Sequence, residues 1–425
     1  MNLDRKSFLR RLGTGAVGLL AGASLRGEAG AAPLPAFAER DPEPYWAAIR
    51  ARYLLAPGFA YFNTGGLGPA AGPVLEVYEK TARHLQEKSE TGHALLADAR
   101  PVLARFLGAE PGEISFVRNA TEGNAIVAAG LGLGAGDEVI FDSHAHPGGS
   151  FPWLNQHKQR GVVVRMFEPD VTDAAGNLAR IAALLTPRTR VVQVSHVTAP
   201  TGIVLPVAAI AKLCRDRGIW FHIDGAQSAG MFPFALRAIG CDSFATSGHK
   251  WIGGPHETGV LFIRRDKLEA VAPTLVGAYS SDLTDLTGEF GYVPTTQRHE
   301  YGTRNAASVV ALAAAVGAQE AVGRERIAAR GRLLAGRIRA GLAGLRDVEV
   351  LSPANPELNA SILTFRSPRI PYDKLFERLL TGHQLRCRPV SEEKLNAVRV
   401  STHLCTSPAE CDRLVDAMTA ILGKT

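Results

Sequence analysis

The chain has 425 residues, of which 46% are hydrophobic and 21% charged, and its formal net charge is +6. This apolar share is ample for a sizeable core, and the length indicates two or three packed units. Half of the net charge lies in residues 1–31, and no basic run interleaved with aromatic residues follows, so the composition argues against a nucleic-acid partner. The five cysteines are an odd number without a CxxC spacing, which argues against a zinc site or a disulfide framework.

Residues 1–31 have the features of an export signal. The basic segment Arg5–Arg10 is followed by an apolar stretch rich in glycine and alanine, Gly13–Leu25, and by small residues at Ala29–Ala31. The pattern resembles a twin-arginine signal, with Arg-Lys in place of the usual Arg-Arg. We therefore expect a periplasmic or otherwise exported protein; the alternative is a cytoplasmic protein with a disordered basic tail. No stretch reaches the roughly 20 apolar residues of a membrane span, so we expect no stable membrane insertion.

Apolar, β-rich runs alternate with amphipathic segments from residue 70 to residue 305. Residues 32–69, which precede them, are expected to join a smaller C-terminal domain. The stretch Leu75–Phe106 is broadly helical, with breaks expected at Gly92 and Pro101. Strands are then predicted at Glu113–Val117, Glu138–Asp142, Val162–Phe167, Arg190–His196, Ile219–Ile223, Ser243–Thr246 and Gly259–Ile263, with helices at Thr121–Gly130 and Pro206–Arg217.

The repetition of strand, helix and strand predicts an α/β fold, with a mainly parallel central sheet and helices on both faces. Beyond residue 305 the pattern changes, and a smaller α+β domain is predicted over residues 306–425. Its elements are two Ala/Arg-rich helices up to Leu345, strands at Val348–Leu351, Ser361–Phe365 and Ala397–Ser401, and helices at Tyr372–Thr381 and Pro408–Leu422. Because parallel sheets bind ligands at the carboxyl ends of their strands, the candidate site residues are those that directly follow strands.

An acid and a lysine follow two consecutive strands. Asp224 ends the strand in Phe221–Gln227, and Lys250 follows the next strand within the sequence Ser247-Gly248-His249-Lys250. Pyridoxal phosphate requires both groups, a lysine for a Schiff base and a carboxylate for the pyridine nitrogen. Alone, Asp224 could be a helix cap and Lys250 a surface lysine. Together they favour a pyridoxal-phosphate site, in which Ser247 and His249 are donors suited to the phosphate.

Two further segments belong to this set. Arg118–Asn124 lies between a strand and an Ala-rich helix, where free backbone N–H groups form an anion site suited to phosphate, although simple N-capping by Asn119 or Thr121 is the alternative. Ser143–Gly149 follows another strand and carries two histidines, one of which could stack on the pyridine ring. The two histidines could instead bind a metal, but no carboxylate–histidine set with metal spacing accompanies them, so we expect no metal site.

The order and the amino-acid sequences of these segments resemble those of the class V aminotransferase superfamily, the fold type I pyridoxal-phosphate enzymes that include cysteine desulfurases and isopenicillin N epimerase. The resemblance extends over residues 45–422, and it is specific at five short segments. These are Asn119–Gly123, His196–Gly202, Asp224–Gln227, Ser247–Lys250 and Tyr301–Asn305.

The resemblance implies a role for each matching residue. Lys250 would hold the cofactor, Asp224 would contact its pyridine nitrogen, Gln227 would approach its phenolic oxygen, and His146 would stack on its ring. Thr198 would take over part of the contact made by the asparagine that desulfurases usually have at the position of Ala199. Ala120, Thr121, Ser247, His249 and Thr303 would hold the phosphate, with Thr303 supplied by the other subunit of a homodimer. On the substrate side, Arg399 would bind an α-carboxylate, and Asn63 matches an amino-terminal substrate-side residue.

Departures from the family pattern bear on the reaction. Cysteine desulfurases carry a mobile nucleophilic cysteine before the carboxylate arginine, but here Ser391 stands at that place and Cys387 lies at a strand position. Ala199 stands where desulfurases usually have asparagine. The chain is therefore more similar to the isopenicillin N epimerase branch, and we expect chemistry at the α-carbon of an amino-acid-like substrate. Cysteine desulfurase, C–S lyase and true aminotransferase remain alternatives. A cofactor-binding sensor or transport protein is another; it would be expected to have lost Lys250 or Asp224, and both are present.

Overall fold

The computed structural model describes residues 33–283 and 286–423, so the predicted export signal over residues 1–31 lies outside the described residues. The larger part of the molecule is built on a seven-stranded sheet in the order β2-β8-β7-β6-β5-β3-β4. These strands are β2 (Ile114–Val117), β3 (Glu138–Asp142), β4 (Val163–Phe167), β5 (Thr189–Ser195), β6 (Trp220–Asp224), β7 (Ser243–Ser247) and β8 (Gly259–Ile263). β8 runs antiparallel to both of its neighbours, whereas β4, β3, β5, β6 and β7 pair in parallel. The predicted α/β class is thereby confirmed.

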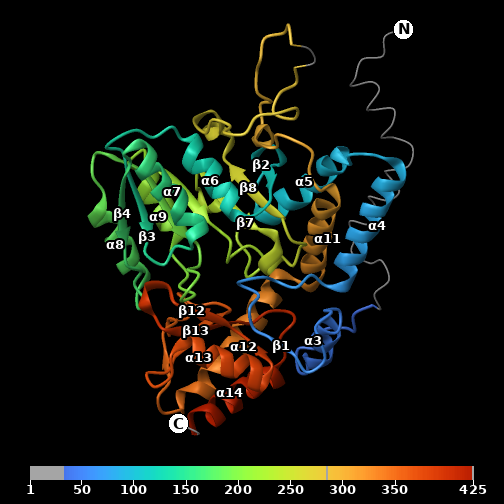
Figure 1. Cartoon of the computed structure of the whole chain (residues 1–425), viewed down its shortest axis with the longest axis vertical. Helices are drawn as coiled ribbons and strands as arrows, with labels where there is room; N and C mark the ends of the chain where they lie inside the picture. Colours follow the sequence, from blue (N-terminus) through green and yellow to red (C-terminus); the bar gives the residue numbers. More distant parts are fainter. Residues whose placement is uncertain (1–32, 284–285, 424–425) are drawn as a thin grey trace.

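Two apolar layers form because successive side chains of a strand point to opposite faces of the sheet. On β6, Phe221 and Ile223 belong to one core cluster, and Trp220 belongs to the other. The first cluster includes helices α4 (Gly72–Lys88), α5 (His93–Leu107), α9 (Val207–Arg215) and α11 (Ala306–Val322). The second includes α6 (Ala120–Gly130) and α7 (Pro147–Arg160), so helices cover both faces (Figure 1). α8 (Ala174–Leu184) and the short α10 (Leu236–Ile239) lie beside α9.

The C-terminal part has its own sheet, with the strand order β12-β13-β10-β9 and antiparallel pairing throughout. Its strands are β9 (Glu349–Val350), β10 (Ile362–Arg366), β12 (Arg388–Val390) and β13 (Ala397–Ser401). Helices α12 (Arg324–Ala343), α13 (Tyr372–Glu377) and α14 (Pro408–Gly423) contribute to its separate apolar core. In Figure 1 this part lies below the larger sheet.

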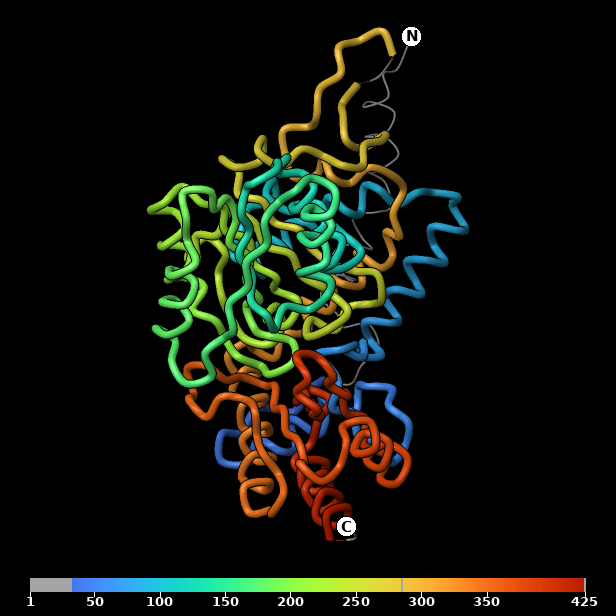
Figure 2. The backbone as a smooth tube through the Cα atoms, turned by 60° about the vertical axis from the view of Figure 1, so that its left-hand side comes forward, coloured from blue at the N-terminus to red at the C-terminus, as the bar shows by residue number. Residues whose placement is uncertain are grey.

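The N-terminal segment packs with the C-terminal part rather than with the large sheet. β1 (Ala60–Tyr61) pairs in parallel with β11 (Leu385–Arg386), and the N–H of Ser401 donates to the carbonyl of Phe62. α3 (Glu43–Arg50) shares a core cluster with Val322 and Leu404. Figure 2 shows the blue N-terminal trace beside the orange and red C-terminal trace.

The structure differs from the prediction in several places, and α11, which was assigned to the C-terminal domain, packs in the core of the larger part. Gly92 does separate α4 from α5, but α5 runs through Pro101. Proline removes one backbone donor from a helix, yet Leu96, Leu103 and Phe106 of this helix are buried in the core, and this packing maintains the helix. The prediction also lacked α7 and α8, and α7 begins with Pro147 at a position where proline is well tolerated.

Among the described helices, none is by itself long and apolar enough to span a membrane. α11 and α12 satisfy the criterion of length and composition only as a pair, and this pair is bent by 80°.

Candidate active site

A cavity of about 220 Å³ lies where the carboxyl ends of β6 and β7 meet the C-terminal sheet. Its lining combines small residues, hydrogen-bond donors, one carboxylate and three cationic side chains. The lining residues are Gly65, Gly66, Asn119, Ala120, Thr121, His146, Gly148, Asp224, Ala226, Gln227, Ser247, His249, Lys250, Arg388 and Arg399.

Lys250 reaches this cavity from a turn of π-helix, Gly248–Ile252, that directly follows β7. The N-terminal segment packs closely against this turn, because the N–H of Gly68 donates to the carbonyl of His249 over 2.8 Å. A Cβ atom at Gly68 would lie 1.8 Å from the carbonyl oxygen of Lys250, so only glycine fits there. Burial lowers the pKa of Lys250 to about 8, which makes the neutral amine accessible at moderate pH.

Asp224 is the last residue of β6, and its carboxylate is almost completely buried. Oδ1 accepts a hydrogen bond from the N–H of Ala226 over 3.0 Å, and Oδ2 accepts one from Nδ2 of Asn124 over 3.0 Å. The α7 backbone lies so close that a Cβ atom at Gly149 would be 2.8 Å from Oδ2. Asp224 therefore faces the cavity as a hydrogen-bond acceptor held by two donors.

The start of α6 forms another wall of the cavity. The N–H of Ala120 donates to Oγ of Ser247 over 2.9 Å, which joins α6 to the end of β7. Thr121 and His249 lie on the same wall. Nδ1 of His249 is buried and has no hydrogen-bond partner among the described residues, and burial lowers the pKa of this histidine to about 4. A helix start beside a hydroxyl and a buried imidazole nitrogen without a partner among the described residues suits a phosphate.

Two arginines form the wall contributed by the C-terminal sheet. Arg388 and Arg399 stand directly opposite each other on β12 and β13. Arg399 donates from Nη1 to the carbonyl of Ala199 over 2.7 Å and from Nη2 to Oδ1 of Asn63 over 3.2 Å. Its Nε is buried without a partner among the described residues, and burial lowers its pKa to about 9. Arg388 forms an ion pair with Glu392, and sequence reasoning missed this second arginine.

Most of the site residues expected from sequence meet in this cavity, but three do not line it. The hydroxyl of Thr198 accepts from the N–H of Ile203 over 2.9 Å and bonds the hydroxyl of Thr201 over 2.8 Å, so the structure corrects the expected cofactor contact of Thr198. Asn63 lies behind the lining, bonded to Arg399. Thr303 is exposed on the loop before α11 and does not reach the cavity of its own chain.

The two candidate histidines, His144 and His146, have different hydrogen-bond partners, and only His146 lines the cavity. His146 caps α7, with Nδ1 accepting from the N–H of Gly148 over 3.0 Å, and it lines the cavity. His144 instead bonds Thr201 through Nδ1 over 2.9 Å and lies 3.1 Å from the carboxylate of Glu168. Of the two, His146 alone is placed to contact a ligand in the cavity.

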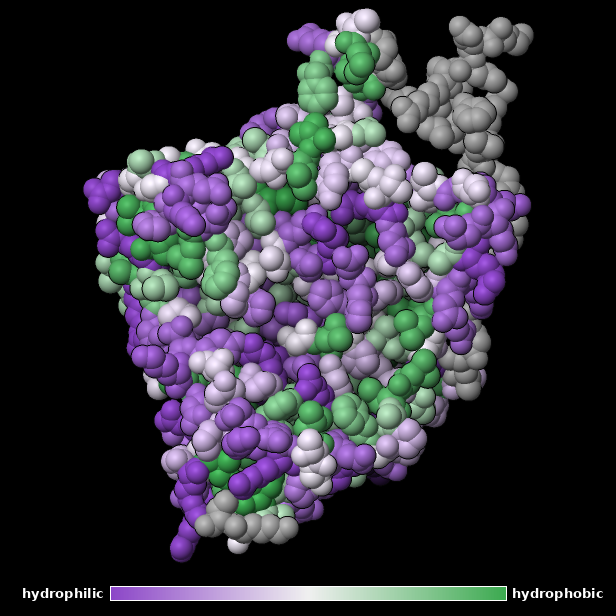
Figure 3. Space-filling model, viewed as in Figure 1, coloured by the Kyte–Doolittle hydropathy of each residue, from purple (hydrophilic) through white to green (hydrophobic). Residues whose placement is uncertain are grey.

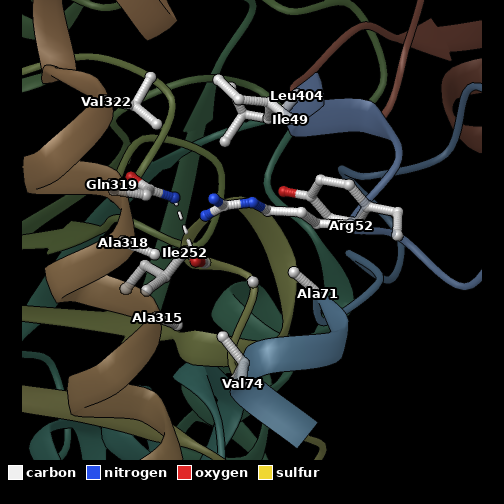
Figure 4. A pocket seen from close by; sticks show the side chains of 12 residues that line it. Ile49, Arg52, Ala71, Val74, Ile252, Ala315, Ala318, Gln319, Val322 and Leu404 are labelled. Carbon is white, nitrogen blue, oxygen red and sulfur yellow. Dashed lines mark hydrogen bonds between the residues drawn. The ribbon is translucent and has the colours of Figure 1, made fainter. Parts of the chain in front are cut away.

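A second pocket, of about 50 Å³, lies between α3, α4 and α11. Figure 4 shows the side chain of Arg52 extending toward Gln319, with Ala71 and Val74 below it. Nε2 of Gln319 donates to the carbonyls of Trp251 over 2.6 Å and Ile252 over 3.1 Å, directly after the Lys250 turn. This small pocket lacks a lysine and a carboxylate, so it supports the Lys250 turn rather than forming a second reactive site.

A buried lysine and a buried carboxylate in one cavity, beside a helix start, define a pyridoxal-phosphate enzyme, and the residues present fit this cofactor. The chain belongs to the class V aminotransferase family, whose model, "Aminotransferase class-V", matches residues 73–385.

The similar proteins include three kinds of enzyme. Isopenicillin N epimerase of Streptomyces clavuligerus is 31% identical over 89% of this chain and 99% of its own length. A probable cysteine desulfurase of Pyrococcus abyssi is 27% identical over 84% of this chain and 93% of its own length. Among solved structures, the cystine C–S lyase C-DES in complex with cysteine persulfide has a TM-score of 0.78 and 28% identity, and the match covers 85% of this chain and 97% of that one.

Proposed function

We propose that this enzyme epimerises an amino-acid-like substrate at its α-carbon, with pyridoxal phosphate bound covalently by Lys250. The observation that carries the proposal is the meeting of Lys250, Asp224 and Arg399 in one cavity. The 31% identity to isopenicillin N epimerase over nearly the whole of that enzyme supports this reaction.

Each wall of the cavity has a part in holding the cofactor. Asp224 would accept a hydrogen bond from the pyridine nitrogen, and His146 would contact the ring. Gln227 would approach the phenolic oxygen; in the structure its Nε2 donates to the carbonyl of Gly65 over 2.8 Å. The start of α6 and the Ser247–His249 segment would hold the phosphate. When bound, pyridoxal phosphate withdraws electrons from the α-carbon and so makes its proton acidic.

Lys250 moves this proton. With cofactor and substrate bound, the amine of Lys250 would take a proton at the α-carbon and return one. A pKa of about 8 suits both roles, because a general base works best when its pKa is close to the working pH. Arg399 binds the α-carboxylate through its planar guanidinium and thereby orients the substrate, and Arg388 adds a second positive charge on the same wall.

The cysteines argue against desulfurase chemistry. None of the five, all of which lie in the described part of the chain, lines the cavity. Burial raises the pKa of Cys387 to about 12, so its thiol stays protonated and is not a mobile nucleophile. Ser391, which follows β12, has the place of the desulfurase nucleophile and has no thiol.

We also propose that two copies of the chain share their active sites. Thr303 is exposed in its own subunit and carries a hydroxyl next to a segment typical of phosphate binding. In the family pattern this threonine comes from the other subunit, and Thr303 does not line the cavity of its own chain, which supports that arrangement.

The reaction is tested by product analysis in D₂O. We would incubate the holoenzyme with L- and D-amino acids and small peptides, and measure inversion by chiral chromatography and deuterium at the α-carbon by mass spectrometry. We expect both in the native enzyme and neither in Lys250→Ala, with borohydride trapping the cofactor on the peptide that contains Lys250. A 2-oxo acid without inversion would identify an aminotransferase instead, and alanine with sulfide from cysteine would identify a desulfurase.

A further inference from the structure

Behind Asp224, a line of buried polar side chains extends along β6. Trp220, His222 and Asp224 share one face of this strand, because side chains alternate. Ser243 is the direct partner of His222 on β7, and Asn124 lies on α6. We call these five side chains, all of them buried, the Asp224 network. Its bonds are Trp220 Nε1 to Ser243 Oγ (2.9 Å), Ser243 Oγ to His222 Nδ1 (2.8 Å), His222 Nε2 to Asn124 Oδ1 (2.8 Å) and Asn124 Nδ2 to Asp224 Oδ2 (3.0 Å).

The chemistry of the groups fixes the direction of every bond. The amide nitrogen of Asn124 faces two acceptors, the carbonyl of Gly148 over 3.1 Å and the carboxylate of Asp224, so the amide oxygen must face His222. Nε2 of His222 therefore carries a proton and donates. Burial lowers the pKa of His222 to about 4, so the imidazole is neutral. Its Nδ1 is unprotonated and accepts a hydrogen bond from the hydroxyl of Ser243.

The network ends at Trp220, whose indole N–H can only donate. Each member thus donates toward Asp224, and no member can reverse without leaving a buried polar group unpaired, which is unfavourable. As a result, Oδ2 of Asp224 always faces an N–H, and Oδ1 is held by the N–H of Ala226. A carboxylate that accepts two donors is stabilised in its ionised form.

Other charged groups also surround Asp224. Asp142, at the end of β3, is fully buried and acts electrostatically on Asp224, and its own pKa is raised to about 7 by burial. Lys250 and His146 face Asp224 from the π-helical turn and from the start of α7. Lys250 attracts the carboxylate of Asp224, whereas an ionised Asp142 repels it. Between these opposing charges, the hydrogen bonds from Asn124 and Ala226 are the direct contacts to the carboxylate of Asp224.

We propose that the Asp224 network directs its donors at the carboxylate of Asp224 and so keeps the proton on the cofactor's ring nitrogen, which makes Asn124 and His222 positioning residues. This inference rests on the proposed pyridoxal-phosphate function. It assigns a task to two side chains that contact neither cofactor nor substrate, and it explains why a buried strand carries a histidine and why an apolar helix face carries an asparagine.

The test is the ¹⁵N resonance of ring-labelled pyridoxal phosphate in the holoenzyme, which moves as the proton passes from nitrogen to oxygen. We expect the native resonance to be that of a protonated ring. Asn124→Leu removes one donor from Asp224 and should change the ratio of nitrogen-bound to oxygen-bound proton by about tenfold or more, which moves the resonance toward neutral pyridine.

Asn177→Leu is the matched control. Asn177 is also fully buried and also makes three hydrogen bonds, but it makes them to Asp170 and Asp173, away from the cavity. Its loss should leave the ¹⁵N resonance unchanged. If Asn124→Leu does not fold, His222→Gln, which keeps a donor toward Asn124, is compared with His222→Leu, which does not. The resonance should move only in His222→Leu.

The failure modes are distinct. A native protein that never binds the labelled cofactor at Lys250 would overturn the proposed function and the inference with it. A native protein with a protonated ring, whose resonance is the same in Asn124→Leu or in His222→Leu, would overturn the inference alone.

Discussion

Lys250 must be neutral before it can attack the carbonyl carbon of the cofactor. Burial, assisted by the positive charges of Arg399 and Arg388, lowers its pKa from 10.5 to about 8, although Asp224 acts in the opposite direction. The charged form of a lysine lies below its pKa, so the reactive fraction rises as the pH increases through about 8.

This dependence predicts how the cofactor attaches. The rate at which apoenzyme reacts with pyridoxal phosphate, followed by absorbance, should rise to half of its limit near pH 8. A model amine with an ordinary lysine pKa is the control, and its rate should still be rising two pH units higher. A half-maximal rate near pH 10.5 for the protein would contradict the proposed environment of Lys250.

At the scale of elements, a buried ion pair connects β2, the strand that leads into α6, to the segment that carries Thr303. Arg100 of α5 contacts the carboxylate of Glu300 over 2.7 and 2.9 Å, and the same carboxylate accepts from the N–H of Phe116 on β2 over 2.7 Å. β2 leads into α6, and Glu300 precedes Thr303 by three residues. The pair therefore ties both segments to one helix.

Arg100→Leu should destabilise the protein strongly, because it leaves the carboxylate of Glu300 buried and uncompensated. We expect a loss of about 3–5 kcal/mol in the free energy of unfolding, measured by urea denaturation. Arg105→Leu on the same helix removes an exposed pair with Glu320, 3.4 Å long, and should cost about 1 kcal/mol or less. Similar losses in the two variants would show that the buried pair contributes no more than a surface pair.

Sequence patterns predicted the elements whose signal is local. Asp224 and Lys250 follow apolar strands, and parallel strands place their carboxyl ends together, so their meeting could be inferred. Pro101 was misread because its helix is maintained by contacts with distant residues. Arg388, Asn124 and His222 were missed for a related reason. Their roles depend on which strand pairs with which and in what register, and Arg388 meets Arg399 only through the pairing of β12 with β13.

At the scale of the whole molecule, an extended segment projects from the large domain (Figure 1). It carries exposed apolar side chains, visible as green atoms in Figure 3, and Leu286 at 98% exposure is the extreme case. The other members are Leu275, Val276, Phe290 and Tyr292. Exposed apolar groups gathered in one segment are typical of protein contacts, and Thr303 lies shortly after this segment in sequence.

Shared active sites predict complementation between inactive subunits. A hybrid of Lys250→Ala with Thr303→Ala should recover activity, because one of its two sites would combine an intact Lys250 with an intact Thr303. Each variant alone should be inactive, and light scattering should show a dimer. The mixture is prepared by refolding the two variants together. A mixture of Lys250→Ala with Asp224→Ala is the negative control, because both residues line the cavity of the same chain and every site would lack one of them. Recovery in neither mixture would place Thr303 in its own subunit.

The pairing of β1 with β11 also bears on the order in which the enzyme is made. Asn63 and Arg399 are 336 residues apart in sequence, yet they are in contact. During synthesis the N-terminal segment leaves the ribosome first, and domains generally fold in the order in which they emerge. The large domain can therefore form while β1 is still without its partner. The wall that carries Arg399 is assembled last, so a nascent chain acquires Lys250 and Asp224 before the side of the cavity opposite them is complete.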